Sequence, residues 1–244
     1  MQAQKITHLI FDADYTLLDY LFDEVAAFER LYRELNIPIS KELLLFSRQS
    51  SEETWTKSGM YDVHKPSVQK NYHKVYREHL YKVFFDVFQK YPCPNPQTTP
   101  QSASERFLTL LEWEGKLLPG VEEVLSSLSE KSGGKYKIYV ATNGLTAIQK
   151  GRLRPLQAYL HGIFVSEEIG SIKPLPAFFE RMIKDMGTSF ENCLMIGDSL
   201  FSDVAGAKSV GMKSCWLNVE GVENNTPFTP EFTISSLKEL FELL

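Results

Sequence analysis

The stretch FDADYTLLD, from Phe11 to Asp19, decides the fold because it places two carboxylates directly after an apolar run. Leu9 and Ile10 begin that run, and such a run is typical of a strand that is buried on both faces. An unpaired charge in a protein core is energetically costly, so acidic residues at the end of a buried strand are normally avoided. Asp12 and Asp14 therefore need a chemical explanation.

Four further short apolar runs lie downstream, and stretches with helical periodicity separate them. The runs cover residues 138–141, 163–165, 193–196 and 215–217. Strands that alternate with helices predict βαβ units and a parallel sheet. We therefore expect an α/β protein with a Rossmann-like, three-layer core, in which the run at residues 8–11 supplies one more strand.

The segment between the first run and the later ones has a different texture, since it shows helical patterns and no strand signal. Apolar residues near its start follow the helical spacing, at positions 21, 25, 28, 32 and 35. A second amphipathic stretch, VYREHLYKVFFDVFQKY, precedes the proline-rich loop PCPNPQTTPQS. We expect residues 20–115 to form a helical domain inserted into a core made of residues 1–19 and 116–244.

Composition excludes several classes of protein. The chain has 244 residues and a net charge of -5, so it carries no global basic field to recruit a nucleic acid polymer. No apolar run approaches the roughly 18 residues that cross a bilayer, and the start has no apolar signal-peptide region. Three cysteines lie far apart, which indicates reduced thiols in a cytoplasmic protein. The oligomeric state stays open.

Polar residues also follow the later apolar runs. The segment VATNG places Thr142 and Asn143 after one run, and LMIGDSLFSD places Asp198 and Asp203 after another. Between them, SIKP offers Lys173. Taken singly, each segment is compatible with an ordinary turn or a helix N-cap. In open α/β sheets, however, ligands bind outside the carboxyl ends of the strands, so we expect these side chains to share one crevice.

The residue types in this crevice predict phosphoryl chemistry. Clustered carboxylates repel one another, so a hard cation must neutralise them, and Mg²⁺ prefers such oxygen ligands. A lysine supplies a fixed positive charge against an anionic substrate, and a threonine hydroxyl donates to phosphate oxygens. This is the equipment for phosphoryl transfer on a small phosphorylated substrate.

The motifs DADYT, ATNG, IKP and GDSLFSD together resemble the four signature motifs of the haloacid-dehalogenase-like hydrolases. The resemblance covers residues 5–19 and 116–220, and the helical insert is similar to the cap domain of one large subgroup. Within the superfamily the core is most similar to the pyrimidine 5′-nucleotidase branch, through FDADYTL, ATNGLTAIQKGRL, VSEEIGSIKP and CWLN. The cap resembles that branch only loosely, at Trp55 and Gly59.

The resemblance implies a role for each acidic residue. Asp12 would be the nucleophile that forms an aspartyl-phosphate. Asp14 would protonate the leaving oxygen and then activate water, and burial beside a second carboxylate is expected to keep it protonated at the start. Mg²⁺ would be held by Asp12, the backbone carbonyl of Asp14 and Asp198, with Asp203 in support.

The resemblance also assigns the remaining polar groups. Thr142 and the Asn143 amide would hold the phosphoryl group, and Lys173 would offset the negative charge that this group shares with Asp12. The dehalogenating members replace the residue at the position of Asp14, because a halide leaves without a proton. Its presence here favours phosphoester chemistry.

The implied function is Mg²⁺-dependent hydrolysis of a phosphomonoester, with a nucleoside 5′-monophosphate as the leading substrate. Three alternatives remain open at this point: a phosphatase of a small phosphorylated metabolite, a phosphomutase, and a non-catalytic protein that binds a phosphorylated ligand. The basic run over residues 65–90 is interpreted as a solvated face or as a contact for an anionic substrate, and Tyr72, Tyr76 and Tyr81 as residues that pack in the cap or stack on a base. We expect His64, His73 and His79 to be solvated helix residues.

Overall fold

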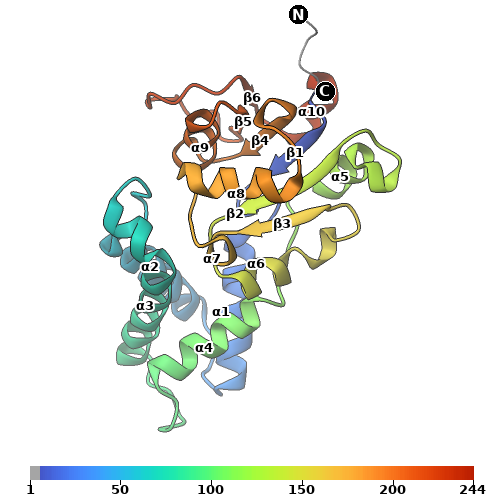
Figure 1. Ribbon diagram of the computed structural model, residues 1–244. Helices are drawn as coiled ribbons and strands as arrows, with labels where there is room; N and C mark the ends of the chain where they lie inside the picture. Colours follow the sequence, from blue (N-terminus) through green and yellow to red (C-terminus); the bar gives the residue numbers. More distant parts are fainter. Residues whose placement is uncertain (1–5) are drawn as a thin grey trace, which may run out of the picture. The chain divides into compact units, whose positions relative to one another are not determined.

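The computed structural model describes residues 6–244 (Figure 1). The chain divides into two compact units, and the divisions fall between Asp19 and Tyr20 and between Lys116 and Leu117. The first unit contains both ends of the chain, whereas the second is a continuous insert. Each unit has its own core.

The first unit is built on a six-stranded sheet in the order β3-β2-β1-β4-β5-β6, and every neighbouring pair is parallel. The strands are β1 (His8–Phe11), β2 (Lys137–Thr142), β3 (Gly162–Val165), β4 (Cys193–Gly197), β5 (Lys213–Leu217) and β6 (Phe232–Ile234). The five predicted apolar runs are all strands. The sixth was not predicted, because β6 is a three-residue edge strand with only one buried residue and no continuous apolar run.

Register brings the carboxyl ends of the three central strands to one level. Phe11, the last residue of β1, pairs with Val140 of β2 on one side and with Ile196 of β4 on the other. The Asp12 backbone N–H continues the ladder by donating to the Ile196 carbonyl at 2.8 Å. Residues that follow β1, β2 and β4 therefore meet at the same edge of the sheet.

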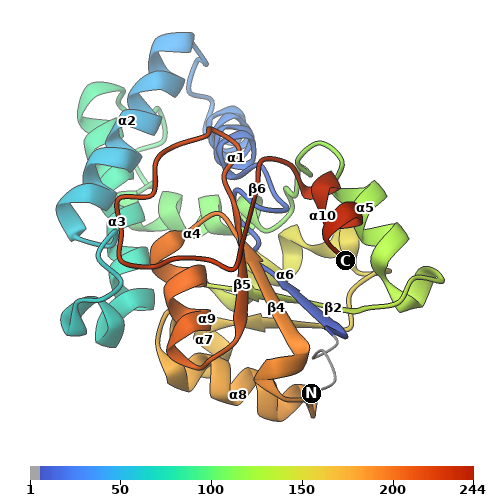
Figure 2. The ribbon, with the colours of Figure 1, turned by 90° about the horizontal axis from the view of Figure 1, so that it is seen from above.

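Helices cover both faces of this sheet (Figure 2). They are α5 (Val121–Leu128), α6 (Thr146–Arg152), α7 (Ser166–Ile169), α8 (Pro176–Met186), α9 (Ala205–Ser209) and α10 (Leu240–Leu243). Figure 2 shows α5 and α10 on one side of the sheet and α8 and α9 on the other. The arrangement confirms the predicted three-layer α/β core.

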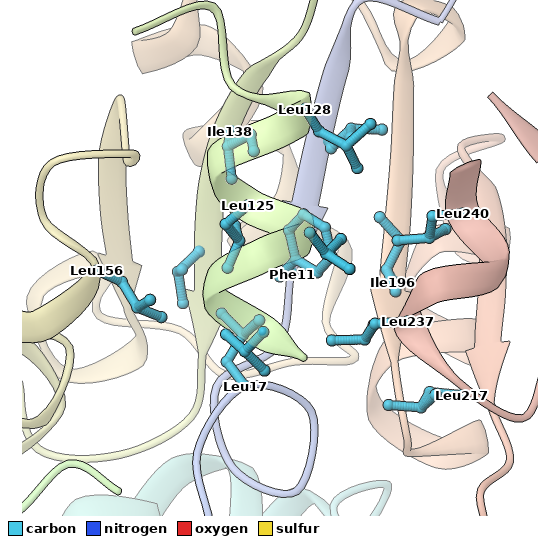
Figure 3. Packing of buried hydrophobic residues seen from close by; sticks show 14 of the residues in the cluster. Phe11, Leu17, Leu125, Leu128, Ile138, Leu156, Ile196, Leu217, Leu237 and Leu240 are labelled. Atoms are coloured by element: carbon cyan, nitrogen blue, oxygen red, sulfur yellow. The ribbon is translucent and has the colours of Figure 1, made fainter. Parts of the chain in front are cut away.

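Alternation along the strands explains why both faces are apolar. Phe11 of β1 points to the face that Leu125 of α5 and Leu240 of α10 cover (Figure 3). Its neighbour Ile10 points to the opposite face, where Phe178 of α8 packs. Successive strand residues face opposite sides, so a strand between two helical layers is apolar at every position.

The second unit consists of four helices, which confirms the predicted helical insert. They are α1 (Tyr20–Glu34), α2 (Lys41–Ser58), α3 (Pro66–Lys90) and α4 (Pro100–Leu111). Phe28, Phe84 and Phe107 meet in its core, with the Phe28 and Phe107 ring centroids 4.6 Å apart. The helix α4 begins inside the predicted loop, because Thr99 caps it and a proline is tolerated in the first turn.

A buried aspartate in the first helix of the helical unit binds the backbone at the end of the insert. Asp23 of α1 is fully buried, and its carboxylate accepts hydrogen bonds from the backbone N–H groups of Gly115, at 3.1 Å, and Lys116, at 2.8 Å. These two hydrogen bonds therefore link the first turn of α1 to the last two residues of the insert.

One expectation about the second unit is wrong. His79 is buried instead of solvated, because it lies on the face of α3 that packs against α2. Its Nδ1 atom shares a 2.7 Å hydrogen bond with the Thr54 hydroxyl. The His79 ring is also in a T-shaped contact with the Trp55 ring. Tyr72 is also buried, whereas Lys70 is exposed.

None of the helices in residues 6–244 combines the length and hydropathy that a membrane crossing requires.

Candidate active site

Asp12 and Lys173 form the centre of the site at the carboxyl edge of the sheet. The Lys173 ammonium donates to Asp12 Oδ1 at 2.8 Å, to Asp203 Oδ1 at 2.6 Å and to the carbonyl of Ala141 at 2.7 Å. Only 1% of Lys173 and 9% of Asp12 is exposed. A lysine buried this deeply is stable only with such partners, so the ion pairs fix the positions of both carboxylates.

Asp203 reaches this centre because the chain leaves space for it. The residue lies in the π-helical turn η4 (Leu200–Val204), and its Oδ2 accepts a hydrogen bond from the Ser199 N–H at 3.1 Å. A Cβ atom on Gly197 would lie 2.2 Å from Asp203 Oδ2. The glycine of the GDSLFSD motif is therefore required by the close approach of this carboxylate.

Asp198 completes an acidic cluster. Its backbone N–H donates to the Thr16 hydroxyl at 3.1 Å, and its carbonyl accepts a 2.8 Å hydrogen bond from the indole N–H of Trp216. Carboxylate oxygens of Asp12, Asp198 and Asp203 all lie within 4.8 Å of one another. Three of the four residues predicted to bind the metal are thus brought together by their side chains.

The electrostatics of the cluster favour a bound cation. Burial and the nearby Asp203 charge raise the pKa of Asp12 well above its ordinary value, although Lys173 opposes this. Burial and Asp203 likewise raise the pKa of Asp198 to about 7. Burial alone would lower the pKa of Lys173, but Asp12 and Asp203 outweigh burial and raise it.

These residues fit a divalent metal ion. Three carboxylates against one ammonium leave an excess of two negative charges when all four groups are ionised. Clustered oxygen donors at this spacing match the preference of Mg²⁺ for carboxylate oxygens. A dication there would neutralise the excess and polarise the oxygens of an anionic substrate.

Thr142 ends β2 and Asn143 follows it at the same edge. The Asn143 side chain is committed to the Lys173 backbone, since its Oδ1 accepts from the Lys173 N–H at 2.8 Å and its Nδ2 donates to the Lys173 carbonyl at 3.0 Å. A phosphoryl contact of Asn143 would therefore come from its backbone amide. The Thr142 hydroxyl is buried and accepts a hydrogen bond from Gln149 at 2.8 Å.

Asp14 lies apart from the acidic cluster. Its side chain is 25% exposed, and its carboxylate pairs with Arg152 and accepts a hydrogen bond from Gln149, both from α6. Only its backbone remains a candidate for the metal, as the sequence motif implies. The expected neighbour of this carboxyl, a second carboxylate, is replaced by a guanidinium.

Sequence reasoning missed Gln149, Arg152, Thr16 and Trp216 as members of the site. Gln149 and Arg152 are separated by three positions in α6 and so lie on one helix face, but this spacing is common in solvated helices. The segment ATNGLTAIQKGRL contains both residues, so the resemblance included them without assigning them a role. Thr16 lies in DADYT and Trp216 in CWLN, so the resemblance included them as well without a role, and only the tertiary fold shows that they contact Asp198.

A comparison with protein families agrees with this geometry. Residues 6–211 match the family model described as haloacid dehalogenase-like hydrolase, and this range includes the acidic cluster, Lys173 and Asp14. The chain is a haloacid dehalogenase-like hydrolase. The parallel sheet and the helical insert are thus those of a member of this family.

Relatives of this hydrolase match over nearly the whole chain. It is 30% identical over 239 residues to the pyrimidine 5′-nucleotidase PynA of Streptococcus pneumoniae, covering 97% of this chain and 94% of the relative. It is 26% identical over 239 residues to the pyrimidine 5′-nucleotidase YjjG of Escherichia coli, with coverages of 97% and 96%. The crystal structure of the HAD-hydrolase YfnB from Bacillus subtilis, bound to magnesium, matches with a TM-score of 0.79 and 26% identity, over 98% of this chain and 99% of that one.

Proposed function

We propose that this hydrolase is a Mg²⁺-dependent phosphomonoesterase that acts through an aspartyl-phosphate on Asp12, with a pyrimidine nucleoside 5′-monophosphate as its substrate. The observation that carries the chemistry is the cluster of Asp12, Asp198 and Asp203 around the Lys173 ammonium. The two nucleotidases that match over almost the full chain support the substrate class.

In the first step, a carboxylate oxygen of Asp12 attacks phosphorus while the bond from phosphorus to the leaving oxygen breaks. Asp14 in its protonated form supplies the proton that the leaving oxygen needs, and the carboxylate that pairs with Arg152 is the form left after this transfer. Lys173, which holds Asp12 in place, offsets the negative charge that builds up on the phosphoryl oxygens, and Thr142 and the backbone of Asn143 hold this group. A bound Mg²⁺ would supply further charge neutralisation.

In the second step, water attacks the phosphorus of the aspartyl-phosphate and the bond between phosphorus and Asp12 breaks. Asp14 accepts the proton from this water, and inorganic phosphate leaves with Asp12 restored as a carboxylate. The need for a proton at the leaving oxygen explains an acid residue next to the nucleophile. A halide leaving group would have no such need, so Asp14 favours a phosphoester substrate.

Phosphate release from a panel of substrates tests the proposal. We expect Mg²⁺-dependent release from UMP, dUMP and TMP with higher kcat/KM than from purine nucleotides or sugar phosphates. Asp12→Asn should lose activity by at least about 10⁴-fold, because a carboxamide does not form the acyl phosphate. Asp185→Asn, on the exposed side of α8, is the matched control and should retain full activity.

Each alternative has its own outcome in this experiment. Preference for a small sugar or acid phosphate would move the substrate to a phosphorylated metabolite. Turnover without release of inorganic phosphate would identify a phosphomutase. Binding of substrate without turnover in Mg²⁺, Mn²⁺ or Co²⁺ would identify a non-catalytic protein, and substantial activity in Asp12→Asn would remove Asp12 as the nucleophile.

A further inference from the structure

The carboxylate of Asp14 is held by two residues of α6. Arg152 Nη1 donates to Asp14 Oδ1 at 2.5 Å, and Gln149 Nε2 donates to Asp14 Oδ2 at 2.9 Å. Arg152 is fully buried and Gln149 is 3% exposed, although Asp14 itself remains partly open to solvent. A guanidinium this deep in a protein requires a carboxylate partner, so the pair is a built feature of the site.

The side chain of Gln149 also connects Asp14 with the proposed phosphoryl pocket. Besides Asp14 Oδ2, its Nε2 lies 2.8 Å from the Thr142 hydroxyl and 3.1 Å from the Asn143 carbonyl. A carboxamide has two N–H donors, so these three acceptors compete for two protons. The strength of the hydrogen bond from Gln149 to Asp14 therefore depends on how strongly the Thr142 hydroxyl and the Asn143 carbonyl accept hydrogen bonds from the same amide.

The orientation of the Gln149 amide is determined by its surroundings. Its Oε1 accepts a hydrogen bond from Arg152 Nη1 at 3.2 Å. Rotating the amide by half a turn would place its NH₂ group against the guanidinium and its oxygen against the Asp14 carboxylate, which are both repulsive contacts. The donors must then face Asp14 and Thr142.

The backbone makes room for this connection. Gly144 has a φ of +150°, and a Cβ atom there would lie 3.0 Å from Gln149 Cγ and 3.1 Å from Nε2. Such contacts are tighter than most packed side chains make. The glycine of the ATNG motif thus lets the Gln149 side chain cross from α6 to the end of β2.

We propose that Arg152 and Gln149 are positioning residues for Asp14, and that Gln149 couples the orientation of Asp14 to occupancy of the phosphoryl pocket. The inference rests on the proposed function. When the Thr142 hydroxyl donates to a phosphoryl oxygen, its own oxygen becomes a stronger acceptor and attracts the Gln149 proton. Asp14 Oδ2, which carries the proton in the acid form, is then free to turn toward the leaving oxygen, while Arg152 keeps Oδ1 anchored.

Leaving-group dependence distinguishes this positioning role from a purely structural one. Gln149→Leu keeps the volume but removes the donors, so Asp14 Oδ2 is no longer oriented before the phosphoryl group binds. Proton delivery should therefore suffer while phosphoryl binding remains. We expect kcat on an alkyl phosphate to fall about 10- to 100-fold, within the range that a general acid supplies, and kcat on 4-nitrophenyl phosphate to change less than about 5-fold. KM should change little for either substrate.

Arg152→Lys and a matched control extend the test. Arg152→Lys keeps the charge but loses the planar guanidinium whose Nη1 reaches both Asp14 Oδ1 and Gln149 Oε1, so we expect the same selective loss on the alkyl phosphate. Lys150→Met, on the exposed side of α6 where Lys150 pairs with Glu168, should leave both rates unchanged. A cycle that combines Gln149→Leu with Thr142→Val should show less than additive losses on the alkyl phosphate, because the coupling needs both partners.

Several results would overturn the proposal. Equal losses on both substrates, no loss on either, or strict additivity with Thr142→Val would each contradict it. Unfolding of both Gln149→Leu and Gln149→Met, measured by circular dichroism, would assign Gln149 to stability alone. Failure of the proposed function is separate, since it would appear as wild-type protein without phosphate release or as an active Asp12→Asn variant.

Discussion

At the scale of single residues, the site depends on two glycines, whose lack of a side chain leaves room for neighbouring polar groups. Gly197 and Gly144 lie at the ends of β4 and β2, and each leaves the space that a polar side chain occupies, Asp203 in one case and Gln149 in the other. The glycines of the two motifs therefore serve packing against neighbouring residues as well as backbone freedom.

We predict that Gly197→Ala destabilises the α/β unit by about 3 kcal/mol, the upper end for an overpacked site, because the new Cβ lies 2.2 Å from Asp203 Oδ2. Asp203 would also be displaced from Lys173, so the rise in stability on adding Mg²⁺ should shrink. Urea unfolding with and without Mg²⁺ measures both effects. Combining the change with Asp203→Ala should be less than additive, and full additivity would show that the two side chains do not compete.

At the scale of one element, α3 holds a buried histidine whose charge state affects the helical unit. Burial lowers the pKa of His79 to about 4 from the ordinary value of 6.5. Between these two values the unfolded chain binds a proton that the folded helix does not. The stability of the helical unit is therefore full above about pH 6.5 and falls as the pH decreases toward 4.

The corresponding prediction concerns His79→Gln, which removes the titrating ring. Wild-type protein should lose about 3 kcal/mol more than the variant between pH 7 and pH 4, since each pKa unit corresponds to 1.36 kcal/mol. Urea unfolding at several pH values measures this difference. His64→Gln, at an exposed position, is the control and should follow the wild type. Parallel pH profiles for His79→Gln and wild type would contradict the assigned buried state.

At the scale of the whole molecule, the two units have separate cores and separate fluorescent reporters. Trp216 belongs to the α/β unit and donates to the Asp198 carbonyl, whereas Trp55 and Trp113 belong to the helical unit. A ligand that binds one folded unit stabilises that unit by mass action. Because the acidic cluster lies entirely in the α/β unit, Mg²⁺ should act there.

We predict two distinct unfolding transitions in Mg²⁺. In Trp55→Phe/Trp113→Phe, the remaining Trp216 should report a urea midpoint that rises with Mg²⁺. The free energy of unfolding should increase by about 2.7 kcal/mol at a hundred times Kd. In Trp216→Phe, the other two tryptophans should report a midpoint that Mg²⁺ leaves unchanged. Adding Asp198→Asn to the first variant should abolish its shift. Equal shifts in both reporters would show that the chain unfolds as one cooperative unit.

The sequence by itself determined the layers of the protein and most of its acidic cluster. Buried parallel strands require apolar residues at every position, so the runs at residues 8–11 and 193–196 were recognisable, and their ends located Asp12 and Asp198. Local periodicity likewise marked the helical insert. These features are local, because a strand or helix imposes its repeat on neighbouring residues.

Only the tertiary structure decided how the site is connected. The pairing of Asp14 with Arg152, 138 positions apart, and the contact of Trp216 with Asp198 arise from strand order and helix packing, which leave no periodic signal. The burial of His79 and the short edge strand β6 were missed for the same reason. Burial and partners of a polar side chain depend on what the rest of the fold packs against it, and neighbouring residues alone do not carry that information.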